Sequence, residues 1–81
     1  MDSTEQNQLE YDITQAIGLY YGENNIKTLR FYSTKDTVSF SFAARIKSEY
    51  EFAIWGTMNK EDTIIDMLDK LDFIVRQRND S

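Results

Sequence analysis

The segment TVSFSFAARI, residues 37–46, decides the fold of this chain. Apolar side chains occupy every second position from Val38 to Ile46, and Ser, Ala or Arg fills the positions between them. A period of two is that of a β-strand with one face buried and the other exposed. We therefore predict a central strand over residues 37–46, with Phe40 and Phe42 facing the core.

Two neighbouring segments have the composition of strands, IKTLRFY at residues 26–32 and YEFAIWGT at residues 50–57. Short polar stretches join each of them to the central strand, as in β-hairpins. The three strands are thus expected to form an antiparallel meander. Its expected register pairs Ser41 with Trp55, Arg45 with Glu51, and Ser39 with Arg30.

Helical periodicity flanks the strands on both sides, over residues 4–21 and 60–77. The apolar stripes are Leu9, Ile13, Ala16, Ile17 and Tyr20 in the first helix, and Ile64, Leu68, Leu71 and Val75 in the second. Gly22 is expected to stop the first helix and Asn59 to cap the second.

The predicted fold class is α+β in the order α-β-β-β-α. A three-stranded antiparallel meander carries both helices on one face. The residues expected beneath the helices are Leu29, Phe31, Val38, Phe40, Phe42, Phe52 and Ile54.

Composition limits the possible functions of the chain. Its 81 residues suffice for one domain, residues 1–81, which we expect to be ordered over about 4–78. It has no Cys and no His, so disulfides and imidazole chemistry are excluded. We expect no enzyme activity, no metal and no cofactor. The polar, acidic start and the lack of a long apolar run predict a soluble, cytoplasmic protein with no membrane contact.

The sheet face opposite the helices is the first candidate site. Alternation assigns to it Thr28, Arg30, Tyr32, Ser39, Ser41, Ala43, Arg45, Glu51, Ala53, Trp55 and Thr57. Trp, Tyr and Arg are the residue types that dominate binding hot spots, so the candidate partner-binding residues are Arg30, Tyr32, Arg45 and Trp55. The alternative is an ordinary solvated face, because scattered exposed aromatics are common in monomers.

An acidic row on the second helix is the other candidate site. It consists of Asp62, Asp66, Asp69 and Asp72, spaced four, three and three residues apart. Such spacing keeps carboxylates near one side of a helix, and the chain has a net charge of −5, from 14 acids and 9 bases. The row is suited to a basic nucleic-acid channel, as in DNA mimicry. The alternative is a solvated helix face.

These features favour a small acidic protein-binding module. Its sharper form is a phage-type inhibitor, or anti-CRISPR-like nucleic-acid mimic, that blocks a basic nucleic-acid-binding protein. One alternative is a homo-oligomeric accessory or structural protein, such as a homodimer formed through the open sheet face. Another is a degenerate relative of double-stranded-RNA-binding domains, which the element order resembles. In those domains the second helix starts with basic residues, whereas NKED occupies residues 59–62 here, so we expect no direct binding of nucleic acid.

Overall fold

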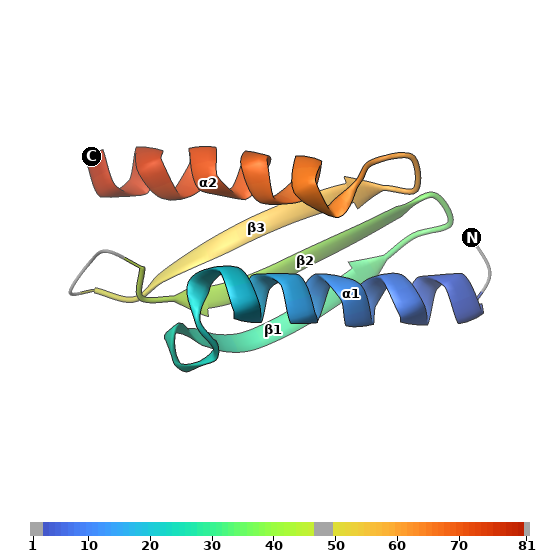
Figure 1. Cartoon of the computed structure of the whole chain (residues 1–81), viewed down its shortest axis with the longest axis horizontal. Helices are drawn as coiled ribbons and strands as arrows, with labels where there is room; N and C mark the ends of the chain where they lie inside the picture. Colours follow the sequence, from blue (N-terminus) through green and yellow to red (C-terminus); the bar gives the residue numbers. More distant parts are fainter. Residues whose placement is uncertain (1–2, 47–49, 81) are drawn as a thin grey trace.

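The computed structural model, which describes residues 3–46 and 50–80, confirms the predicted α+β fold and element order. The elements are α1 (Ser3–Tyr21), a short 3₁₀ turn η1 (Glu23–Asn25), β1 (Ile26–Ser33), β2 (Thr37–Ala44), β3 (Phe52–Asn59) and α2 (Ile64–Asp80). The strands form one antiparallel sheet in the order β1-β2-β3. Figure 1 shows α1 crossing in front of β1 and β2, and α2 running alongside β3.

The core lies between the sheet and the two helices. Alternate side chains of β2 are buried as predicted, including Phe40 and Phe42. The other members of the buried cluster include Ile13 and Ile17 of α1, Ile54 and Met58 of β3, and Met67, Leu71 and Val75 of α2. The predicted core residues Leu29, Phe31 and Phe52 are half-buried and pack against this cluster. Because the cluster joins side chains of both helices to the buried face of β2, both helices cover the same face of the sheet.

The β2–β3 register is the predicted one, with Ser41 opposite Trp55. The β1–β2 register is not, because a bulge between Lys27 and Arg30 places Arg30 opposite Ser41 instead of Ser39. Thr28 in the bulge has a φ of 58°, which is unusual for a β-branched residue. A bulge adds one residue and reverses the alternation before it. Lys27 consequently pairs with Ala43 on the exposed face of the sheet.

Two positions require glycine, one because of its backbone conformation and the other because no space is left for a side chain. Gly22 ends α1 with a φ of 91°, and its N–H donates to the Gly18 carbonyl at 3.0 Å, as the sequence predicts. Gly56 lies on β3 beneath the Phe40 ring. A Cβ at this position would be 2.4 Å from Phe40 Cζ, so the ring occupies the space of the missing side chain.

The start of α2 differs from the prediction. Asn59 is the last residue of β3, and α2 begins at Ile64. Thr63 caps the helix, since its Oγ1 accepts from the Asp66 N–H at 3.1 Å and the Asp66 carboxylate accepts from the Thr63 N–H at 3.3 Å. This reciprocal arrangement is a capping box. Residues 59–62 form a turn instead, in which the Asn59 N–H donates to the Asp62 carboxylate at 3.0 Å.

Within the part of the chain that the structure describes, neither helix is both long and apolar enough to cross a membrane.

Candidate functional site

The exposed face of the sheet, which we call the open face, consists of three cross-strand rows. They are Lys27–Ala43–Ala53, Arg30–Ser41–Trp55 and Tyr32–Ser39–Thr57, each running from β1 through β2 to β3. No side chain in the β2 column of these rows is larger than Ser. The floor of the face is therefore shallow, and larger side chains rise from the edge strands on either side.

The largest of these side chains, Tyr32 and Trp55, meet over the floor. Their rings stack with centroids 5.8 Å apart and an interplanar angle of 25°. Tyr32 is 49% exposed and Trp55 is 61% exposed. The two rings belong to opposite edge strands and reach each other because Ser39 and Ser41 between them are small. Beside the stack, the hydroxyl oxygens of Ser39 and Thr57 are 3.2 Å apart.

The structure brings together three of the four residues predicted for this face. Arg30 shares a row with Trp55, and Tyr32 stacks on the same indole. Arg45 is separate, beyond the end of β2, where its N–H donates to the Asn25 carbonyl at 3.0 Å.

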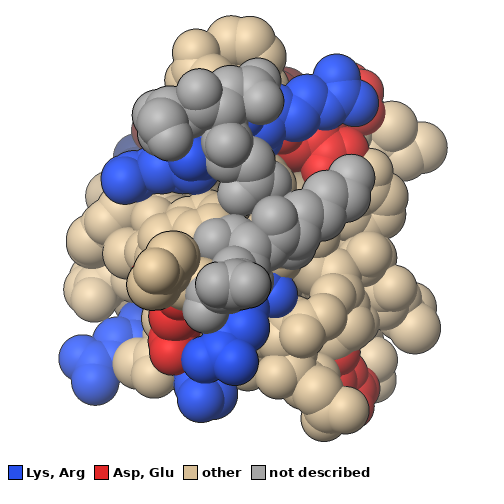
Figure 2. All heavy atoms as spheres, turned by 90° about the vertical axis from the view of Figure 1, so that its left-hand side faces the viewer, with Lys and Arg blue, Asp and Glu red and all other residues tan. Residues whose placement is uncertain are grey.

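Sequence reasoning missed Lys27, which only the bulge turns to the open face. Its Nζ lies 4.0 Å from the Glu51 carboxylate, so Glu51 forms an ion pair with Lys27, whereas the predicted partner was Arg45. All three residues line one small hollow at this end of the sheet. Figure 2, which faces the same end of the molecule, shows Lys and Arg side chains gathered there.

The acidic row does not form a line of free carboxylates. Asp62 lies before α2, in the turn, and its carboxylate is also 3.6 Å from Lys70 Nζ. Asp66 belongs to the capping box, and Asp72 faces α1. Asp69 alone among the four has no hydrogen bond or ion pair with a described residue. Three of the four carboxylates therefore serve the fold of this chain.

Asp72 joins the two helices through a pair of tyrosines. Tyr21 donates its hydroxyl hydrogen to Asp72 Oδ1 at 2.9 Å, and Tyr20 donates to Oδ2 of the same carboxylate. The two phenol rings make an edge-to-face contact with centroids 4.8 Å apart. Burial and the hydrogen bond to Asp72 raise the pKa of Tyr21 well above its ordinary value. This contact was missed because it depends on how the helices lie relative to each other.

The raised pKa of Tyr21 predicts a loss of stability in alkali. The native state holds the phenol proton more tightly than the unfolded chain does, so the stabilisation is complete below about pH 10, the ordinary pKa, and falls as pH rises above it. Urea unfolding between pH 7 and pH 11 should show a steeper alkaline decline for wild type than for Tyr21→Phe. The exposed Tyr11 supplies the matched control, Tyr11→Phe. Equal slopes for wild type and Tyr21→Phe would refute this role.

Among residues 3–46 and 50–80, no group of three or more carboxylates is arranged to hold a metal ion. Comparison with models of known protein families, with curated proteins and with solved structures gives no match.

Proposed function

We propose that this chain is a protein-binding module and that its binding surface is the open face. The observation that carries the proposal is the Tyr32–Trp55 stack, which stands exposed over a floor of small side chains. A partner covering the stack would remove two large rings from water, the kind of burial that dominates interface energies. The flat floor beside the rings leaves room for a side chain of the partner.

The competing interpretation is that the stack only stabilises the sheet. A cross-strand aromatic pair contributes roughly 0.2–1 kcal/mol to a sheet, whereas a Trp at the centre of an interface contributes about 2 kcal/mol or more to binding. If the stack is a binding site, loss of the indole should weaken binding far more than folding. If the stack only stabilises the sheet, loss of the indole should affect folding alone.

The charges of the open face indicate the partner's chemistry. Among the described residues, Lys27 and Arg30 lie on the face, Arg45 lies at its end, and Glu51 is the acid beside them. These described residues are basic in balance although the chain carries a net charge of −5. A protein surface with an apolar centre and acidic groups around it is complementary to this face. The overall negative charge opposes binding to a nucleic-acid backbone.

The inhibitor form of the proposal, in which the acidic row enters a basic nucleic-acid channel, draws its support mainly from Asp69. Asp69→Lys is its appropriate test. Asp66→Lys would also disrupt the capping box, which contributes about 0.5–2 kcal/mol to a helix, so its effect on binding would be mixed with an effect on folding.

Capture from native cell lysate tests the open face. We expect a protein retained by wild type to be lost with Trp55→Ala, by roughly 30-fold or more in affinity. The matched control is Phe73→Ala, because Phe73 on α2 is 62% exposed and Trp55 is 61% exposed. Both variants should melt within a few degrees of wild type.

Three other outcomes would change the assignment. Loss of capture with Phe73→Ala but not Trp55→Ala would contradict the role of the open face. Loss with Asp69→Lys alone would transfer the site to the acidic row. Salt-sensitive binding of a labelled single-stranded oligonucleotide to wild type, abolished by Trp55→Ala, would replace the protein partner with nucleic acid.

A further inference from the structure

The two edges of the sheet differ in their capacity to accept another strand. The strand order β1-β2-β3 leaves one side of β1 and one side of β3 unpaired within the sheet. The bulge at Thr28 interrupts β1, which is a common way of blocking an edge. By contrast, all eight residues of β3 keep one unbroken register with β2.

The backbone groups at the outer edge of β3 follow from the register. The Lys60 N–H donates to the Asp36 carbonyl at 3.3 Å, one step beyond the Thr37–Asn59 pair. Lys60 therefore occupies a hydrogen-bonded position of the ladder. Because hydrogen-bonded and non-bonded pairs alternate in an antiparallel ladder, the even-numbered residues of β3 also bond to β2. The N–H and C=O groups of the odd-numbered residues then point outward. Those of Asn59 bond to Asp62, which leaves Ala53, Trp55 and Thr57 as a row.

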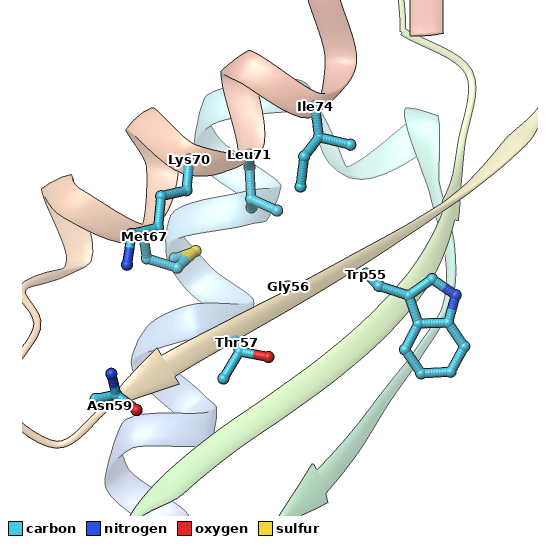
Figure 3. Close-up of a pocket in the computed structure, with 8 residues that line it drawn as sticks. All are labelled: Trp55, Gly56, Thr57, Asn59, Met67, Lys70, Leu71 and Ile74. Atoms are coloured by element: carbon cyan, nitrogen blue, oxygen red, sulfur yellow. The ribbon is translucent and has the colours of Figure 1, made fainter. Parts of the chain in front are cut away.

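A hollow of about 330 Å³ lies between this edge and α2. Figure 3 shows Met67, Leu71 and Ile74 directed from α2 toward β3, whereas the Trp55 indole points to the opposite face of the strand. Since a cavity of about 150 Å³ holds a benzene ring, the hollow is large enough for two apolar side chains.

We propose that an extended segment of the partner protein adds to β3 as a fourth strand. Its backbone pairs with the outward groups of Ala53, Trp55 and Thr57, and its apolar side chains, at every second position, enter the hollow beneath α2. The remaining side chains lie on the open face beside Trp55. This inference rests on the proposed function, and it specifies how the partner is held.

An extended peptide suits this edge better than a second copy of the chain. An extended backbone offers donors and acceptors at the spacing of the outward groups of Ala53, Trp55 and Thr57. A copy of β3 would bring its own α2 along, on the same face. Adjacent strands are about 4.8 Å apart and packed helices need about 8–10 Å, so the two helices would collide. The segment must therefore carry no helix on that side.

A synthetic peptide of sequence TVSFSFAA, the sequence of β2, is a suitable probe because its apolar residues alternate with small ones. Added in excess to the ¹⁵N-labelled protein, it should slow amide hydrogen exchange at Ala53, Trp55 and Thr57 on the order of tenfold or more. The amides of Ile54 and Gly56, which already bond to β2, should change little. The control is the same peptide methylated on the alternate backbone nitrogens that would face β3, which should leave the exchange rates of all three amides unchanged.

Two variants at one position separate backbone pairing from side-chain contact. Thr57→Pro removes the outward N–H, a change that edge strands tolerate, and should abolish the protection. Thr57→Val keeps the N–H and should retain it. Unchanged exchange at all three amides of wild type, or protection that survives Thr57→Pro, would overturn strand addition. The capture result with Trp55→Ala depends on the indole side chain, so the proposed function and this mode of binding fail separately.

Discussion

Replacement of Phe42 by Ala should lower the free energy of unfolding by about 3–5 kcal/mol. Phe42 is 2% exposed, lies opposite Ile54 on β3 and stacks at 6.3 Å from the Phe40 ring. Removing the ring forfeits its transfer free energy and leaves a cavity between the sheet and both helices. Small domains are stable by only about 5–15 kcal/mol, so the variant should be partly unfolded at modest urea concentrations.

Chemical denaturation followed by circular dichroism measures this loss. Phe73→Ala is the matched control, because Phe73 is exposed on α2 and exposed substitutions usually change stability by about 0.5 kcal/mol or less. A loss of under about 1 kcal/mol for Phe42→Ala would mean that β2 presents its other face to the helices.

Gly56→Ala should destabilise the protein by about 1–3 kcal/mol, although Ala is no worse than Gly as a strand residue. The added Cβ would lie 2.4 Å from Phe40 Cζ and 3.1 Å from Leu71 Cδ2. Phe40 is fully buried, with Phe31 and Phe42 close to its ring. The ring therefore cannot move without displacing its neighbours.

A double-mutant cycle isolates this contact. Phe40→Leu shortens the side chain above Gly56, so Gly56→Ala should cost less in the Phe40→Leu background than in wild type. Gly18→Ala is the control, because a Cβ there meets only the flexible Glu23 side chain at 3.3 Å, and Ala stabilises a helix interior relative to Gly. Equal costs of Gly56→Ala in both backgrounds would contradict the role of the Phe40 ring.

The sequence predicted those parts of the fold that depend on local pattern. Alternation along residues 37–46 identified the buried face of β2, and short connections fixed the β2–β3 register that sets Trp55 opposite Ser41. The bulge in β1 was missed because Thr28, at positive φ, gives no glycine signal. The start of α2 was predicted wrongly because two capping patterns follow each other, Asn59 with Asp62 and Thr63 with Asp66. Asn59 pairs with Thr37 at the end of the sheet, so the helix starts after Thr63.

The candidate site was only partly predictable for a related reason. Strand parity placed Arg30, Tyr32 and Trp55 on one face, but the stacking of the two rings depends on their rotamers. The engagement of Asp72 by Tyr20 and Tyr21 depends on the distance between the helices. The hollow beside β3 likewise arises from the position of α2, which no local pattern encodes.

Site-specific photocrosslinking tests the central claim most directly. A benzophenone amino acid replaces Ala53 on the open face in one variant and Phe73 on α2 in another, two exposed positions that leave the Trp55 indole in place. If the open face is the binding surface, irradiation in native lysate should give a discrete crosslinked partner from position 53 and none from position 73. A discrete crosslink from position 73, with none from position 53, would contradict this account.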